Sequence, residues 1–161
     1  MKKLGIIALL TIIGLNSAMA QLIKVDQEVF GMDCAPCAYG LERGLKKMDG
    51  LEKVQVSLND GKAYLQLSVN NKLTLKKIQE LVKSNGFSAR NAIVTLKGEL
   101  SKVGDEWQLN TDDETFTITP DTPANVLSAL NTRQVTVKGH VKDEEDGNLD
   151  NSWKIQITEI L

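Results

Sequence analysis

Cys34 and Cys37 are the two cysteines of this 161-residue chain, and two residues separate them in the stretch GMDCAPCAYG. Thiolates at this spacing suit three kinds of chemistry: they bind one soft metal ion, they exchange electrons as a dithiol and disulfide, or they close a structural disulfide. A disulfide across so short a loop constrains little of the unfolded chain and adds little stability. The spacing therefore favours a functional pair, and the surrounding sequence must indicate which function.

A helix is expected to begin at this pair. Pro36 fits a first helical turn, and four apolar residues then recur at helical spacing: Ala38, Leu41, Leu45 and Met48. The N-terminal end of a helix stabilises negative charge, which favours the thiolate form of Cys37. A metal held by only two thiolates stays open to attack by the thiols of an acceptor, as a carrier requires. A thioredoxin-like module is disfavoured, because a hairpin follows too soon after the helix and no tryptophan precedes the pair.

The first 20 residues predict an export signal. Lys2 and Lys3 precede an apolar run at 4–15, and the triplet at 18–20 fits signal-peptidase cleavage before Gln21. The run is shorter than the roughly 20 apolar residues that a membrane span needs. We expect a periplasmic or secreted mature chain with no membrane span after cleavage. Because such compartments are oxidising, thiolates there must be kept reduced or occupied.

Charge is distributed unevenly along the mature chain. Residues 21–93 contain 11 basic and 8 acidic side chains, whereas residues 94–161 contain 6 basic and 13 acidic ones. This asymmetry predicts two modules, at 21–93 and 94–161. The acidic charge and the scarcity of aromatic residues in the second module argue against nucleic-acid binding. No constellation for hydrolysis, phosphate binding or cofactor chemistry is present, so we do not expect an enzyme.

The first module alternates strands and helices. Apolar periodicity predicts strands at 23–30, 54–58, 63–69 and from 87 onward, with helices after residue 37 and after Thr74. The turn NDGK at 59–62 joins the middle strands as a hairpin, and Thr74 is placed to cap the second helix. Gly50 and Gly86 stand where the helices should end. The order βαββαβ predicts an α+β fold, a ferredoxin-like sandwich.

The stretch GMDCAPC, the helix after it and the NGF before the last strand resemble the heavy-metal-associated domain family over residues 23–93. The resemblance implies that Cys34 and Cys37 are the ligands of one metal ion. It also implies that Met32 packs into the core beneath the loop and that Phe87 lies in the outer shell of the site, where many members have Lys or Tyr. The family includes copper chaperones and domains of metal-pumping ATPases, so it implies a membrane metal transporter or another metal-binding protein as partner.

Asp33 stands where many copper and mercury binders of the family have Thr. Thiolates select Cu(I), Hg(II), Zn(II) and Cd(II), whereas an added carboxylate suits Zn(II) or Cd(II), which take three or four donors. Asp33 is therefore a candidate third ligand, and its alternative role is to cap the helix, as Asp often does. The metal stays open between Cu(I), Hg(II), and Zn(II) or Cd(II).

The second module predicts a small OB-like β-barrel. Five strand-like segments occur, at 94–100, 106–111, 115–119, 135–141 and 153–160, with a short helix after Thr122-Pro123. Gly98 and Gly139 lie inside strands and indicate bulges or bends. No Gly, Pro or Ser spacer separates the modules, so one strand through 91–96 is expected to join them. His140, the one histidine, could serve the metal only by meeting the Cys34 loop across the modules.

These features favour an exported protein that captures or carries one soft metal ion between Cys34 and Cys37. Two alternatives remain open. The same pair could work as a thiol–disulfide module, or the chain could be an interaction or assembly protein whose barrel does the work.

Overall fold

The computed structural model describes residues 19–143 and 152–161 of the chain. The predicted signal peptide, apart from its last two residues, lies outside the described residues. In the part that the structure describes, no helix has the length and apolar character needed to cross a membrane.

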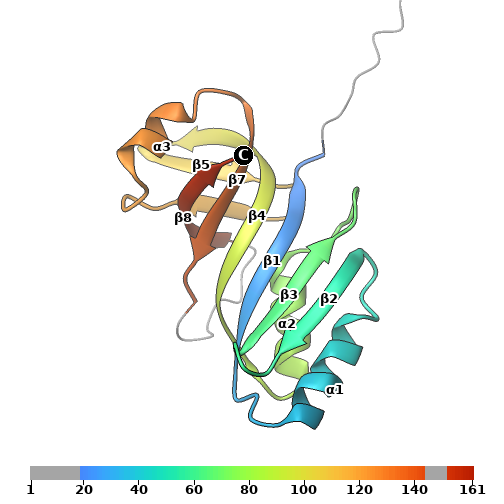
Figure 1. Ribbon diagram of the computed structural model, residues 1–161. Helices are drawn as coiled ribbons and strands as arrows, with labels where there is room; N and C mark the ends of the chain where they lie inside the picture. Colours follow the sequence, from blue (N-terminus) through green and yellow to red (C-terminus); the bar gives the residue numbers. More distant parts are fainter. Residues whose placement is uncertain (1–18, 144–151) are drawn as a thin grey trace, which may run out of the picture.

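The N-terminal half has the predicted βαββαβ order. Its elements are β1 (Gln21–Phe30), α1 (Ala35–Leu45), β2 (Leu51–Ser57), β3 (Lys62–Leu67), α2 (Leu75–Ser84) and β4 (Ser88–Val103). The strands form an antiparallel sheet in the order β2-β3-β1-β4. Helix α1 packs on β2 and α2, and α2 packs on β4 and β1, so both helices cover the same face of the sheet (Figure 1). This is the ferredoxin-like arrangement that the sequence predicts.

Local signals place the ends of α2 as expected. The side chain of Thr74 accepts a hydrogen bond from the backbone N–H of Lys77, which satisfies one of the free donors of the first turn. Gly86 follows the last turn with a φ of 88°, in the left-handed region that glycine adopts without strain. The inner face of the helix is buried at Leu75, Ile78 and Val82.

The C-terminal half adds β5 (Glu106–Asn110), β6 (Thr115–Ile118), α3 (Ala124–Ala129), β7 (Gln134–Val141) and β8 (Ser152–Ile160). Strand β4 pairs with β5, β5 with β6, β6 with β8, β8 with β7, and β7 with β4 again, so these five pairings form a closed cycle. The pairing of β6 with β8 is parallel, and the other four are antiparallel. The five segments and the short helix occur where the sequence predicts them, and their OB-like classification stays a prediction.

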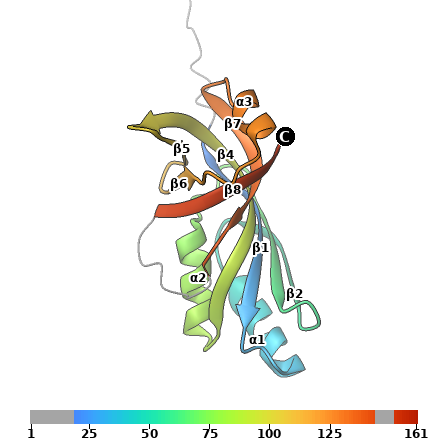
Figure 2. The same ribbon diagram turned by 90° about the vertical axis from the view of Figure 1, so that its left-hand side faces the viewer.

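The 16-residue strand β4 is common to both halves, as the missing spacer predicts. It pairs with β1 as far as Lys97 and with β5 from Glu99, while β7 runs along residues 92–99. Gly98 lies at the change of partner, where a Cβ would come within 3.4 Å of the carbonyl oxygen of Asn110. Figure 2 shows this long strand curving from the helical half into the second half. The shared strand fixes the two halves to each other.

Glu114 forms a second connection between the halves, which the sequence did not suggest. Its buried carboxylate accepts hydrogen bonds from the backbone N–H groups of Leu75 and Lys76, at 2.8 and 3.0 Å, in the first turn of α2. It also accepts one from the indole N–H of Trp153 in β8, at 2.9 Å. The first turn of α2 contains no acidic residue of its own, so a carboxylate from a distant loop stabilises the positive end of that helix.

Gly139 is the position where a side chain is least tolerated in the second half. The β7–β8 register shifts between Lys138 and Gly139, which confirms the predicted bulge. A Cβ there would lie 2.7 Å from the carbonyl oxygen of Gln156 and 2.7 Å from the Ile155 side chain. We expect Gly139→Ala to lower the free energy of unfolding by about 2–3 kcal/mol, because the backbone of β8 must move to make room.

Urea unfolding of the Gly139→Ala variant measures this loss. The matched control is Gly40→Ala in α1, where a Cβ meets no atom within 4 Å and alanine favours the helix. A Gly139→Ala variant as stable as the Gly40→Ala variant would mean that the bulge accommodates a methyl group, contrary to this packing.

Candidate metal site

The cysteine pair lies where the loop after β1 leads into α1, at the end of the molecule opposite α3 (Figure 1): Cys34 ends the loop and Cys37 is in the first turn of the helix. Gly31, with a φ of 86°, turns the chain out of β1, and Cys34 is the N-cap residue of α1. Cys34 and Cys37 form a disulfide, with their Cα atoms 5.1 Å apart. The two sulfurs therefore converge on one point at the start of a helix, as the spacing predicts.

The start of α1 favours negative charge on these sulfurs. The backbone N–H of Cys37 donates a hydrogen bond to Sγ of Cys34 at 3.2 Å, and Pro36 occupies the first turn, where its missing N–H costs nothing. No acidic residue lies in that turn. Both cysteines are half-buried, so the pair can be reached from solvent. In a reduced pair, the helix dipole and this N–H would stabilise the thiolate of Cys34.

The alternative role of Asp33 as the helix cap is wrong. The N-cap residue is Cys34, because its side chain, one position later than Asp33, receives the N–H of the first turn. Asp33 itself is exposed beside the pair. In the described residues, no three His, Cys, Asp or Glu side chains are grouped to hold a metal ion. The role of Asp33 as a third ligand therefore stays a prediction.

Met32 and Phe87 both contact the hydrophobic core. Met32 is buried in the core with 6% of its surface exposed, as the resemblance implies. Phe87 is half-buried and packs against the same core. It precedes Ser88, which pairs with Phe30 at the end of β1, so the Phe87 turn and the cysteine loop lie at the same end of the sheet.

His140 lies elsewhere in the molecule. It is on the outer surface of β7, where it shares a small cleft with residues of β8 and of the loop after β6. Among the described residues, His140 is not grouped with the cysteines to hold a metal ion.

Two exposed aromatic residues flank the loop and were not singled out in the sequence. Phe30 is 66% exposed at the end of β1, and the guanidinium of Arg90 lies 5.2 Å from its ring centre. Tyr39 is 64% exposed on α1, and the guanidinium of Arg43 lies 5.8 Å from its ring. The signal in the sequence was the charge on the same face: Glu28 stands two residues before Phe30 in the strand, and Glu42 and Arg43 stand three and four residues after Tyr39 in the helix.

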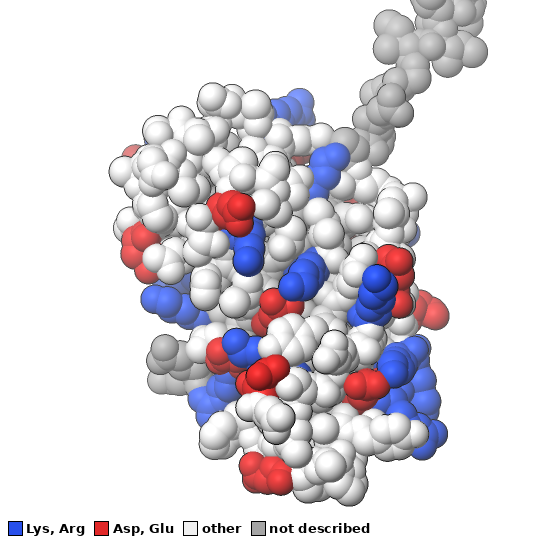
Figure 3. All heavy atoms as spheres, in the orientation of Figure 1, with Lys and Arg blue, Asp and Glu red and all other residues white. Residues whose placement is uncertain are grey.

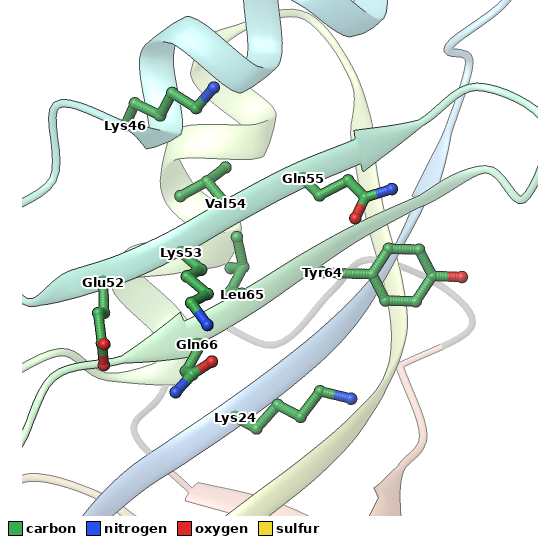
Figure 4. A pocket seen from close by; sticks show the side chains of 9 residues that line it. All are labelled: Lys24, Lys46, Glu52, Lys53, Val54, Gln55, Tyr64, Leu65 and Gln66. Atoms are coloured by element: carbon green, nitrogen blue, oxygen red, sulfur yellow. The ribbon is translucent and has the colours of Figure 1, made fainter.

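A separate groove of about 530 Å³ lies over β2 and β3 (Figure 4). Lys53, Gln55, Tyr64 and Gln66 project from neighbouring strands along it. No residue of the cysteine loop lines this groove, so it is not part of the candidate site. Figure 3 shows positive and negative side chains interspersed over most of this side of the molecule, with several positive ones gathered at the lower right.

Comparisons with known proteins identify relatives of the N-terminal half. The family model for the heavy-metal-associated domain matches residues 28–88. The mercuric transport protein periplasmic component of Shewanella putrefaciens is 31% identical over 87 residues, which are 54% of this chain and 93% of that protein. A copper-transporting ATPase of Helicobacter pylori is 32% identical over 77 residues, 48% of this chain but only 10% of the ATPase.

Among solved structures, a yeast copper transporter domain, studied in apo and Cu(I)-loaded states, is 25% identical to this chain. The match covers 42% of this chain and 90% of that domain, with a TM-score of 0.39. The region that the family model matches includes Cys34 and Cys37, and the second half of the chain lies outside it.

Proposed function

Because this chain belongs to the heavy-metal-associated domain family, we propose that it captures and carries one soft metal ion between Cys34 and Cys37. One observation supports this proposal above the others: the two sulfurs converge, half-buried, at the N-terminal end of α1. Two thiolates there can share an ion while one side of it stays open to an acceptor. The proposal includes no catalytic step.

The metal-binding form in this proposal is the reduced one. In the disulfide, each sulfur is bonded to the other, so the pair must first accept two electrons and two protons from a dithiol or two thiols, which are themselves oxidised to a disulfide as the Cys34–Cys37 bond breaks. These thiols release their protons as they bind the metal. Met32 would support the loop from the core, and Phe87 would shield the site from the neighbouring turn.

Cu(I) and Hg(II) are the favoured ions. Both are soft and accept a two-thiolate site, and the relatives are named for mercuric and copper transport. The exposed Asp33 carboxylate next to Cys34 would add a harder donor, which would extend the range to Zn(II) or Cd(II). We propose Asp33 as this third ligand, because α1 uses Cys34 as its cap and leaves the carboxylate of Asp33 available.

The proposed setting is the periplasm, with residues 1–20 as a cleaved signal peptide. The periplasmic relative and the signal-like N-terminus support this location. The acceptor would be a membrane metal transporter or another metal-binding protein. We propose that residues 21–93 are the metal-binding domain and that residues 94–161 are an OB-like barrel, which the closed cycle of five strands supports. The shared strand β4 would hold the metal loop rigidly on this scaffold.

The disulfide supports a second candidate function, a thiol–disulfide module that uses the same pair. The two candidates differ in what the reduced protein does. A carrier binds an ion tightly, whereas an exchange module has a reduction potential in the range of oxidoreductases and little affinity for metals.

Native mass spectrometry of the reduced protein under anaerobic conditions tests the proposal. Cu(I), Hg(II) and Zn(II) are offered separately and in limiting amounts, beside the same protein in its disulfide form. We expect one ion per chain in the reduced form and none in the disulfide form. Retention of Zn(II) as strongly as Cu(I) would indicate a third donor such as Asp33, whereas strong preference for Cu(I) or Hg(II) would indicate the two thiolates alone. Failure of the reduced protein to retain any of the ions would overturn the carrier proposal.

A further inference from the structure

A small cleft lies on the outer surface of the second half, where β7, β8 and the loop after β6 meet. Its volume is about 120 Å³, and its lining comprises Thr119, Asp121, His140, Lys142, Lys154 and Gln156. None of these residues belongs to the cysteine loop or to its half of the chain. The volume is roughly four times the ~30 Å³ that one water molecule occupies in the liquid, which is enough for one small polyatomic ion.

The strand register brings the polar side chains of the cleft together. His140 pairs directly with Gln156, and the adjoining pair Val141 and Ile155 is fully buried on the opposite face. Because side chains alternate along a strand, Lys142 and Lys154 lie one step further on the same outer face as His140. The floor of the cleft is therefore a pair of β-strands that presents three nitrogen-bearing groups to solvent.

The loop after β6 forms the remaining wall and is held in place. The side-chain amide of Gln156 donates a hydrogen bond to the backbone carbonyl oxygen of Asp121 at 2.9 Å. The hydroxyl of Thr119 donates one to the backbone carbonyl oxygen of Ile155 at 3.2 Å. The carboxylate of Asp121 lies 3.5 Å from Nζ of Lys142. A hydrogen bond with Thr119 and the nearby Lys142 charge keep the pKa of Asp121 below its usual value, so this carboxylate is ionised at neutral pH.

The cleft contains more cationic groups than anionic ones. Asp121 balances Lys142, whereas the ammonium of Lys154 and the imidazole of His140 have no hydrogen-bond or ion-pair partner among the residues that the structure describes. A metal cation is disfavoured beside two lysines. An anion would accept charge-assisted hydrogen bonds from the N–H groups of Lys154 and His140.

We propose that this cleft binds one free tetrahedral oxyanion of the size of inorganic phosphate or sulfate. Lys154 and His140 are its main ligands, and Lys142 contributes charge from the other side of its ion pair with Asp121. The site is independent of the metal function, because it uses no residue of the cysteine loop.

NMR titration of the ¹⁵N-labelled protein tests the site. Inorganic phosphate, inorganic sulfate and acetate are added separately, with sodium chloride adjusted to hold the ionic strength constant. We expect saturable shifts of the amides near 119–121, 140–142 and 154–156 with phosphate and sulfate, and weaker binding of acetate. Lys154→Gln and His140→Phe should each weaken binding about five- to tenfold, since each removes one ligand at a solvent-accessible site.

The matched control is Lys138→Gln, an exposed lysine on the same strand that does not line the cleft. This variant should bind phosphate as the unaltered protein does. Shifts that do not saturate, or equal weakening by Lys138→Gln and Lys154→Gln, would identify an adventitious ion only and overturn the proposal. Because all three substituted side chains are exposed, a preserved amide spectrum shows that each variant is folded.

Discussion

Replacing both Cys34 and Cys37 by serine is expected to abolish binding of soft metal ions. Serine keeps the size of each side chain but offers a neutral hydroxyl in place of a thiolate, and a hydroxyl is a poor ligand for Cu(I) or Hg(II). Loss of a residue that merely orients a ligand weakens metal affinity about 10–100-fold, so loss of both ligands should exceed ~100-fold. A competition titration of the reduced protein against a chromophoric chelator measures the change.

The two single variants are the matched controls for this experiment. Cys34→Ser and Cys37→Ser each keep one thiolate, so each should retain weak binding that the double variant lacks. Unfolding of the double variant should match that of the reduced protein, and the disulfide form should gain at most about 2 kcal/mol, because a four-residue loop constrains little of the unfolded chain. Unchanged affinity in the double variant would place the ligands elsewhere in the chain and refute the site.

Replacing Glu114 by alanine is expected to give the largest loss of stability. The change leaves three donors without their acceptor: the backbone N–H groups of Leu75 and Lys76 and the indole N–H of Trp153. Each buried donor without a partner costs about 1–3 kcal/mol, and water entering the vacated space recovers part of this. We therefore expect a loss of about 3–5 kcal/mol in the free energy of unfolding at neutral pH, measured by urea titration.

Asp113→Ala is the control, because this neighbouring carboxylate is exposed, and substitutions of exposed residues usually change stability by less than about 0.5 kcal/mol. A Glu114→Ala variant within that range would show that the connection between α2 and the second half contributes little. A large loss confined to Glu114→Ala would show that this contact between α2 and the second half stabilises the fold.

The pH dependence of stability provides an independent check on Glu114. Burial raises the pKa of its carboxyl above the usual value, and the hydrogen bonds from Lys76, Leu75 and Trp153 only partly oppose this. A raised pKa in the folded state means that the protonated form is the one that folding favours. The stability that this titration of Glu114 contributes is therefore fully present below the pKa of glutamate in the unfolded chain, about 4.3, and is lost as the pH rises through its pKa in the folded protein.

Glu114→Gln removes this titration, so the stability difference between the unaltered protein and the variant should shrink between about pH 4 and neutrality. A difference that stays constant with pH would mean that Glu114 has the same pKa in the folded and unfolded chains.

Much of the N-terminal half was predictable because its signals are local. The apolar spacing of α2, the cap at Thr74 and the glycine after α2 act over a few residues, and each was found where the sequence indicated it. Helix α1 ends at Leu45, one turn before the predicted end at Met48 and Gly50. The convergence of Cys34 and Cys37 follows from the same local logic, since three positions span one turn at the start of a helix. Asp33 was harder to interpret. Helix α1 begins one residue later than a cap at Asp33 would require, so Cys34 is the N-cap residue.

The elements, the convergence of the two cysteines and the strand common to both halves could thus be predicted from the sequence, because periodicity, capping and the missing spacer are properties of neighbouring residues. Only the tertiary structure decided which distant groups meet. The carboxylate of Glu114 reaches a helix 38 residues away, and His140 joins Lys154 through the β7–β8 register. Such contacts depend on how β6 and β7 each align with β8, and no local pattern in the sequence specifies that alignment.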